Sequence, residues 1–277
     1  MTLSEWLIRA EDALTGALCP DSRVDAKLIA AGALSKSPGE IRFLGGMEIE
    51  ENVLEILESR LQRRVKGEPL QYIENTAYFM DFEFYVDERV LIPRQDTETL
   101  VEFALEKIKN VKEPKILDIC TGSGAIAVSL SAYRKDARVI ASDISEDALI
   151  VSRINAQKTH ADVTCIQSDL FDSIPDQKFD LITANPPYLT KDDMSHLQTE
   201  VKAEPALALF GGEDGLDLYR RISKGVYDYL NKGGYALFEV GEGQASDVLS
   251  IMTSEKTTEK GIIKDLCGID RVVWIRS

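Results

Sequence analysis

From about residue 96 to the C-terminus, short apolar runs typical of buried strands alternate with amphipathic segments of helical period. Such alternation predicts a mostly parallel sheet with helices on both faces. The last two runs, 261–266 and 271–275, are too close for a helical crossover, so we expect them to pair as an antiparallel hairpin. The predicted fold class is therefore α/β. The expected strands are 115–120, 138–143, 163–166, 181–183 and 234–240, and the expected helices are about 97–109, 125–133, 145–159, 216–230 and 244–253.

Residues 1–75 have a different character and are predicted to form a small helical bundle of their own. Thr2 and Glu5 have the spacing of a capping box, and apolar residues follow at helical spacing. Asp21 is expected to cap a second helix, and a third, longer helix carries apolar residues over 53–65. This segment reads as a separate domain.

Residues 76–92 are rich in aromatic and branched side chains, with a polar break at Asp87-Glu88. Such a pattern predicts a β-hairpin that links the helical bundle to the remaining chain. The larger α/β domain is then expected to comprise residues 93–277.

Composition narrows the class of protein. With 32 basic and 47 acidic residues the net charge is −15, which disfavours direct binding to nucleic acid and allows a protein partner. The four cysteines form no Cys-x-x-Cys pair and only two histidines are present, so we expect reduced thiols, a cytoplasmic protein and no metal site. The chain shows no signal peptide, and no apolar run approaches the roughly 18 residues of a membrane span.

Residues 118–127 describe a strand that ends in a Gly-rich turn and opens a helix. Gly122 and Gly124 let the backbone turn tightly and approach a ligand closely. Asp143 ends the next strand, where a carboxylate can hold both hydroxyls of a ribose. The turn and Asp143 together predict a ligand that carries an adenosine ribose, either a nicotinamide dinucleotide or S-adenosylmethionine.

Other residues favour S-adenosylmethionine. Asp118 places a carboxylate beside the turn, where a cationic methionyl group is a better guest than a pyrophosphate, although it can equally cap local donors. The Gly turn also lies well inside the chain, behind a predicted helix, and the sheet ends in a hairpin. Asp169 and Leu170 follow the third strand, where they are expected to contact an adenine, unless Leu170 is ordinary core.

Asn185-Pro186-Pro187-Tyr188 follows an apolar run that reads as a buried strand. Ligands of open α/β sheets bind at the carboxyl ends of the strands. The two prolines stiffen the backbone and keep Asn185 extended. An amide side chain, a backbone carbonyl and an aromatic ring on such a segment suit a planar NH₂ group, which needs two acceptors and a flat face. These residues alone do not separate an adenine from a side-chain amide.

These motifs resemble those of class I S-adenosylmethionine-dependent methyltransferases that act on planar NH₂ groups. Segments 67–73, 92–98, 204–207 and 211–216 resemble in addition the release factor glutamine methyltransferase family, also called PrmC/HemK, nearly from end to end. Membership implies a Rossmann-like domain, S-adenosylmethionine as cofactor with S-adenosylhomocysteine as product, and peptide chain release factors as partners. The implied substrate-binding residues are Asn185, Pro186, Pro187 and Tyr188, and the implied cofactor-binding residues are Asp118, Cys120, Thr121, Gly122, Ser123, Gly124, Asp143, Asp169, Leu170 and Asn185.

The resemblance implies that the protein methylates the glutamine side chain in a Gly-Gly-Gln motif and so acts in translation termination. We expect the protein to be a monomer. Three positions depart from the family pattern: Cys120 replaces a glycine, Gln95 a proline and Leu170 a tryptophan. The alternatives are an adenine amino methyltransferase on DNA or RNA, a nicotinamide-dependent oxidoreductase and a non-catalytic binding module. Whether Arg94 and Glu98 contact the substrate is left open.

Overall fold

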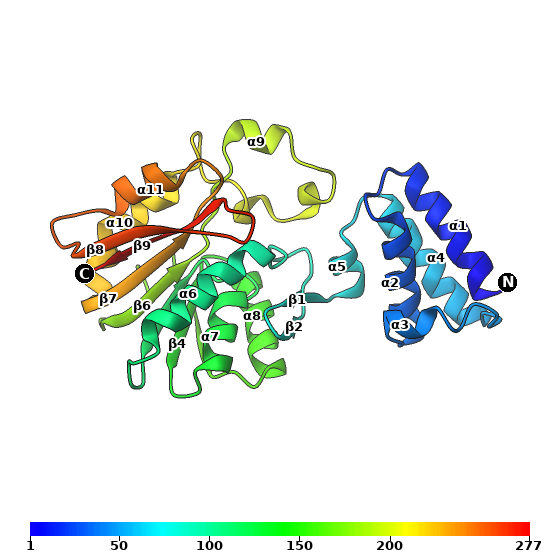
Figure 1. The fold of residues 1–277 in the computed structure, drawn as a ribbon, viewed down its shortest axis with the longest axis horizontal. Coiled ribbons are helices and arrows are strands. Elements are labelled where there is room, and N and C mark those ends of the chain that lie inside the picture. The colour runs from blue at the N-terminus through cyan, green and yellow to red at the C-terminus, as the bar shows by residue number, and fades with distance from the viewer. The chain divides into compact units, whose positions relative to one another are not determined.

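The computed structural model describes residues 1–277 and divides into two compact units (Figure 1). The first unit comprises Met1–Thr76 together with Gln198–Ala203, and the second comprises Ala77–Leu197 together with Glu204–Ser277. The short segment 198–203 therefore packs with the helical unit although both of its flanks belong to the other one. The sequence contains no signal for this exchange.

The helical unit contains the three expected helices and two short ones. The Thr2 hydroxyl accepts from the Glu5 amide and the Glu5 carboxylate accepts from the Thr2 amide, which confirms the predicted capping box. Asp21 stands at the N-cap of the second helix, as predicted from Asp21-Ser22, but its side chain makes no capping hydrogen bond. The helices are α1 (Leu3–Gly16), α2 (Ser22–Leu34), α3 (Pro38–Ile41), α4 (Glu51–Val65) and α5 (Leu70–Glu74).

A buried ion pair ties α2 and α4 together inside this unit. Arg64 is 4 % exposed, and its Nε donates to the Asp25 carboxylate at 2.7 Å. The same guanidinium pairs with Glu200, from the segment that joins the helical unit. Because one buried cation holds two acidic groups, Arg64 fixes segment 198–203 to the helices.

The segment after the helical unit forms a shorter hairpin than predicted. Strands β1 (Ala77–Phe79) and β2 (Phe82–Phe84) pair antiparallel around a turn at Met80-Asp81. The sequence predicts the break at Asp87-Glu88, but the Asp87 side chain binds Arg89 at 2.5 Å, and residues 85–92 form no strand. The expectation of strands on both sides of Asp87 was therefore wrong.

The second unit is built on a seven-stranded sheet with the order β5-β4-β3-β6-β7-β9-β8. The first five strands in this order run parallel, and β9 pairs antiparallel with both β7 and β8. The predicted parallel sheet with a terminal antiparallel hairpin is thus confirmed. The strands are β3 (Lys115–Ile119), β4 (Arg138–Asp143), β5 (Val163–Gln167), β6 (Phe179–Ala184), β7 (Leu230–Glu239), β8 (Glu259–Lys264) and β9 (Asp270–Arg276).

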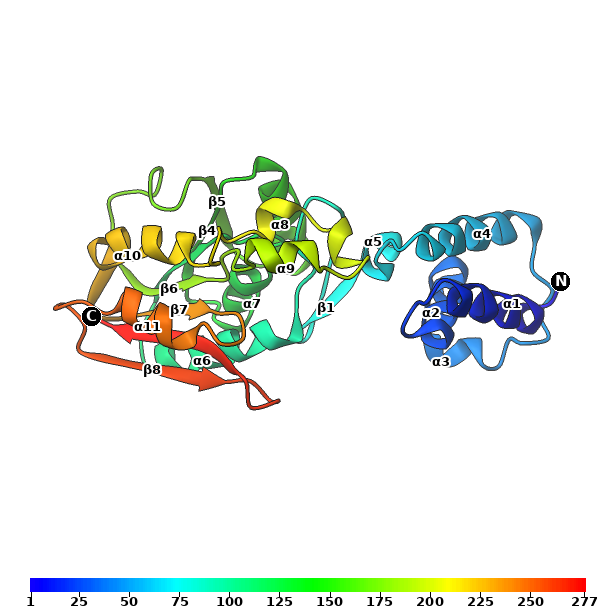
Figure 2. The same ribbon diagram turned by 90° about the horizontal axis from the view of Figure 1, so that it is seen from above.

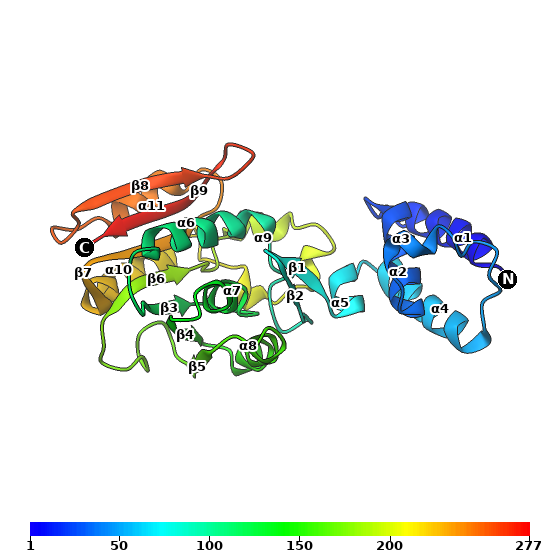
Figure 3. The ribbon, with the colours of Figure 1, turned by 60° about the horizontal axis from the view of Figure 1, so that its bottom comes forward.

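Helices cover both faces of this sheet (Figures 2 and 3), and an apolar core lies on each face. One joins the sheet to α10 and α11 through Tyr219, Val226 and Val248, and the other joins it to α6 and α7 through Leu100 and Val128. Alternate strand residues therefore face opposite cores, as a sheet covered on both sides requires. The helices are α6 (Glu98–Ile108), α7 (Ala125–Tyr133), α8 (Glu146–Lys158), α9 (Lys191–Ser195), α10 (Asp217–Tyr229) and α11 (Ala245–Met252), with one-turn 3₁₀ helices at Gln95–Thr97, Val201–Ala203 and Ala206–Ala208.

The register of the sheet determines which loops meet. Ile119 pairs with Ala184 across β3 and β6, and with Ser142 across β3 and β4. The loops that follow these three strands therefore leave the same edge side by side. The strand order reverses between β3 and β6, and such a switch point is where open α/β sheets bind ligands. None of the helices combines the length and the apolar character needed to cross a membrane.

Candidate functional site

The Gly-rich turn between β3 and α7 adopts a conformation that only small side chains tolerate. Gly122 and Gly124 have φ angles of 54° and 82°, in the left-handed region. A Cβ atom at Gly124 would lie 2.6 Å from the Ser152 hydroxyl, whereas one at Gly122 would project into open space. Gly124 is therefore required for packing against α8, and Gly122 leaves room for a ligand.

Asp118 lies beneath this turn and not on its open side. Its side chain is fully buried, and its two oxygens accept from the Thr121 and Thr183 hydroxyls at 2.6 and 2.7 Å. Burial raises the pKa of this carboxyl to about 7 against the opposing effect of those bonds. The structure thus gives Asp118 a role in holding the turn to β6, and does not bring it to the cavity.

Asp143, at the end of β4, joins the two loops that flank it. One carboxylate oxygen accepts from the Gly122 amide at 2.9 Å, and the other accepts from the Ser145 amide at 3.0 Å. Burial raises the pKa of Asp143 while these backbone bonds act against it. A carboxylate oxygen can accept further hydrogen bonds, so Asp143 can hold a ribose without losing its contacts to the turn.

One cavity in the second unit gathers most of the predicted residues. Asn185 and Pro187 meet the Gly-rich turn at its wall, across the β3–β6 switch point. Asp118, Gly124, Pro186 and Tyr188 do not line it. The predicted residues that line it are Cys120, Thr121, Gly122, Ser123, Asp143, Asp169, Leu170, Asn185 and Pro187.

The far wall is mostly apolar and is closed by an ion pair. Leu170 lines the cavity with a φ of 54°, an uncommon conformation for a leucine that is sometimes found at functional sites. Asp169 binds Arg221 of α10 at 2.7 Å, so this carboxylate is already paired. Ile144 and Leu91 add apolar surface, which suits a flat aromatic base.

Cys120 also adopts a left-handed conformation, with a φ of 57°. The family pattern has glycine at this position, where such a φ carries no Cβ penalty. Burial raises the pKa of the Cys120 thiol well above its usual range, with the nearby carboxylates of Asp143 and Asp118 adding to the effect. The thiol is therefore neutral and acts as a small apolar group in the cavity wall.

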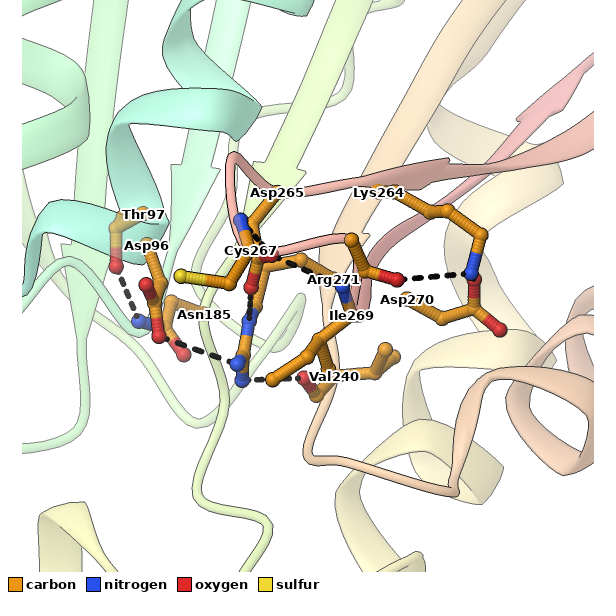
Figure 4. A network of polar contacts seen from close by, with 11 residues as sticks. Asp96, Thr97, Asn185, Val240, Lys264, Asp265, Cys267, Ile269, Asp270 and Arg271 are labelled. Carbon is orange, nitrogen blue, oxygen red and sulfur yellow. Dashed lines mark hydrogen bonds and ion pairs between the residues drawn. The ribbon is translucent and has the colours of Figure 1, made fainter.

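Asn185 follows β6 and is held from behind. Its side-chain nitrogen donates to the Thr97 hydroxyl at 3.3 Å, as Figure 4 shows. The buried carboxyl of Glu239, at the end of β7, lies close enough to the Thr97 and Asn185 side chains for both to lower its pKa. Thr97 lines the same cavity and is itself buried. Polar contacts therefore restrain the Asn185 amide.

The residues after Asn185 are fixed by backbone contacts. The Tyr188 carbonyl accepts from the Gln244 side chain at 2.9 Å, and Leu189 forms a β-bridge with Phe210. A Cβ atom at Gly211 would lie 2.6 Å from the Pro187 carbonyl oxygen, so the two loops are in close contact. Burial raises the pKa of Tyr188 to about 12. The tyrosine is therefore a neutral side chain packed against the apolar core that joins the sheet to α10 and α11.

Arg94 and Glu98 have structural partners. Arg94 pairs with Glu204, whose carboxylate also accepts from the Ile92 amide at 3.2 Å. The Glu98 carboxylate accepts from the Met80 amide at 2.6 Å. Neither Arg94 nor Glu98 lines the cavity, so the structure assigns them to the packing of the segment before β3.

The donor set of the cavity fits a nucleoside cofactor. Asp143 supplies acceptors for ribose hydroxyls, the turn at Gly122 leaves space, and Leu170 faces the same cavity. No group of three or more His, Cys, Asp or Glu side chains is arranged to hold a metal ion. Sequence reasoning missed Thr97, Arg221 and Glu239, because each reaches the site from an element distant in the chain.

Comparison with known proteins adds three observations. The family models for the PrmC N-terminal domain and the methyltransferase small domain match residues 5–74 and 95–208. The release factor glutamine methyltransferase of Clostridium acetobutylicum is 42 % identical over 82 % of this chain and 81 % of its own length. That of Koribacter versatilis is 36 % identical over 99 % of this chain and 98 % of its own. A methyltransferase structure from Pyrococcus furiosus superposes with a TM-score of 0.53 at 14 % identity, covering 79 % of this chain and 98 % of that one.

Proposed function

Because this chain belongs to the release factor glutamine methyltransferase family, whose members depend on S-adenosylmethionine, we propose that it methylates peptide chain release factors. The group modified is the side-chain amide nitrogen of the glutamine in their Gly-Gly-Gln motif. The second product is S-adenosylhomocysteine. The protein acts in the cytoplasm as a monomer and has no direct contact with nucleic acid.

One observation carries this proposal. The register of β3 and β6 brings Asn185 and Pro187 to the same cavity as the Gly-rich turn and Asp143. A cofactor held by the turn would therefore present its reactive end to the Asn-Pro-Pro-Tyr segment. A nicotinamide-dependent oxidoreductase has no use for a rigid amide-binding segment at that point, which favours methyl transfer to an NH₂ group.

The cofactor is held by residues already engaged with the protein backbone. Asp143 binds the ribose hydroxyls, and the turn at Gly122 accommodates the adjacent part of the molecule. Leu170 and Ile144 enclose the adenine, and Asp169 or its amide contacts the base edge. The sulfonium of the bound cofactor supplies a highly electrophilic methyl group, so the transfer needs no metal.

The remaining task of the protein is alignment. A side-chain amide nitrogen is a poor nucleophile because its lone pair is delocalised into the carbonyl. The Asn185 side-chain oxygen and the Pro186 carbonyl accept hydrogen bonds from the two N–H groups of the substrate amide. Tyr188, which packs against the apolar core behind this segment, holds the segment in place. Holding the nitrogen, the methyl carbon and the sulfur in line can supply roughly 7–11 kcal/mol of the barrier. A single preorganised donor or acceptor contributes about 2.7–4 kcal/mol, so alignment is the larger effect.

The helical unit provides the surface for the rest of the protein substrate. It matches the PrmC N-terminal domain over residues 5–74, and its own core gives it a fixed shape. The glycines beside the target glutamine let the substrate backbone enter a narrow site.

The proposal is tested with Asn185→Ala. The substitution removes the acceptor for the substrate amide, so methyl transfer should fall by about 100-fold or more while cofactor affinity stays within about twofold. Calorimetry measures cofactor binding, and mass analysis of the Gly-Gly-Gln peptide measures transfer. Full turnover by this variant would remove Asn185 from the reaction, and methylated DNA or RNA with an untouched peptide would favour adenine as the substrate.

A further inference from the structure

We propose that Glu239 is a positioning residue that turns the Asn185 amide so that its oxygen faces the substrate. This role rests on the function proposed above. Glu239 is buried and acts through Asn185 and Thr97, so it need not itself touch the substrate glutamine.

The sheet places Glu239 directly behind Asn185. Phe238 of β7 pairs with Ala184, the last residue of β6. The residues that follow them in the chain, Glu239 and Asn185, therefore lie side by side. Glu239 is 1 % exposed, and its Oε2 atom is buried without a hydrogen-bond partner. A buried carboxyl with an unsatisfied oxygen is costly to fold, which points to a role beyond packing.

The hydrogen bonds around Asn185 determine which way its amide faces. A carboxylate can only accept hydrogen bonds, so the Asn185 group that faces Glu239 must be its NH₂. The same NH₂ group donates to the Thr97 hydroxyl at 3.3 Å, and Thr97 also lies beside Glu239. With the NH₂ group turned toward Thr97 and Glu239 behind the site, the amide oxygen is the atom left for the cavity. This oxygen is the acceptor that a substrate NH₂ requires.

A buried cation supports the ionised form of Glu239. Arg271 of β9 is held by Asp265 at 3.2 Å, by Asp96 at 3.1 Å and by the Val240 carbonyl at 3.3 Å (Figure 4). Its charge favours a Glu239 carboxylate, whereas the charge of Asp96 disfavours it. Two phenols also face Glu239: Tyr188, and Tyr219 of α10, which donates to the Glu239 carbonyl at 2.6 Å.

These surroundings make the orientation of Asn185 dependent on pH. Burial raises the pKa of Glu239 to about 7, while the neighbouring polar side chain of Thr97, the charge of Arg271 and the side chain of Asn185 oppose this rise. A protonated Glu239 carries an O–H donor, which can bind the Asn185 oxygen and turn it away from the cavity. The population with a correctly turned amide should therefore rise as the pH rises through about 7.

The test is a series of variants of the full-length protein assayed with S-adenosylmethionine and a release factor. Glu239→Gln keeps the shape but carries an NH₂ group that competes for the Asn185 oxygen. We expect kcat to fall by about 10- to 100-fold and to lose its rise through pH 7, with cofactor affinity within about twofold of the unsubstituted protein. Thr97→Val should also lower kcat, whereas Thr97→Ser, which keeps the hydroxyl, should restore it.

A matched control comes from the opposite end of the same sheet. Asp180→Asn also converts a partly buried carboxylate to an amide, but Asp180 accepts from the Lys115 amide and Asn231 at the amino end of β6. Its kcat and pH profile should be unchanged. Glu239→Gln with an unchanged kcat and pH profile would overturn the proposal, as would equal rates for Thr97→Val and Thr97→Ser. If the unsubstituted protein transfers no methyl group to glutamine, the proposed function fails instead.

Discussion

Alanine substitutions in the Gly-rich turn can distinguish three effects of an added Cβ atom: strain in a left-handed backbone, a steric clash with a neighbour, and obstruction of the cavity. Gly124 and Gly268 share the same φ of 82°, but only Gly124 has a close neighbour for an added Cβ. At Gly124 that atom would meet the Ser152 hydroxyl at 2.6 Å, whereas at Gly268 it would meet nothing within 4 Å. Gly122 is also unobstructed, but its open space is the cavity. Alanine at each position therefore isolates a different effect.

The expected magnitudes follow from these distances. Gly268→Ala should lower the free energy of unfolding by about 1–2 kcal/mol, the usual cost of a left-handed conformation. Gly124→Ala carries the same cost and adds about 1–3 kcal/mol for overpacking against Ser152, so its loss should be about 2–5 kcal/mol. Gly122→Ala should resemble Gly268→Ala in stability, but should weaken S-adenosylmethionine binding at least about tenfold, or about 1.4 kcal/mol.

Urea unfolding gives the stabilities and calorimetry gives the affinities. The three variants differ only in position, so each is a control for the other two. Equal stabilities for Gly124→Ala and Gly268→Ala would show that the contact with Ser152 does not constrain the turn. Unchanged affinity in Gly122→Ala would show that the cofactor does not approach this part of the backbone.

Three further results are expected. Arg64→Ala leaves the buried Asp25 without its cation and should lower the free energy of unfolding of the helical unit, measured in urea, by about 3–5 kcal/mol. Arg138→Ala, at an exposed position, should change it by less than about 0.5 kcal/mol. Equal effects would contradict the buried ion pair. Because burial raises the pKa of the Cys120 thiol, iodoacetamide at pH 8 should alkylate the exposed Cys267 first. Peptide mapping measures the two rates, and faster labelling of Cys120 would show that its thiol is exposed to solvent. Asp143→Asn should weaken cofactor binding at least about tenfold in calorimetry, and an unchanged affinity would remove Asp143 from the ribose site.

The sequence was sufficient for the sheet and for most of the cavity wall. The apolar pattern of the sequence located strand β4 and helix α7 at their observed bounds, because each lies between clear breaks. The Gly turn and Asp143 were recognisable because a short loop after a strand has few conformations. Asn185 was recognisable from the prolines that follow it.

Features that depend on tertiary contacts were not predictable. Glu239 reads as a strand residue, and only the pairing of β7 with β6 places it behind Asn185. Segment 198–203 has no periodicity, and its association with the helical unit depends on Arg64, over a hundred residues earlier in the chain. The hairpin turn was misplaced because the polar Asp87 resembles a turn residue, although its side chain binds Arg89.

The most direct test of the account is mass analysis of a release factor after incubation with this protein and S-adenosylmethionine. We expect one added methyl group on the glutamine of the Gly-Gly-Gln peptide, formed at least about 100-fold more slowly by Asn185→Ala. Isotope-labelled cofactor would trace the methyl group to its donor. An unmodified glutamine after incubation with the unsubstituted protein and bound cofactor would contradict the central claim.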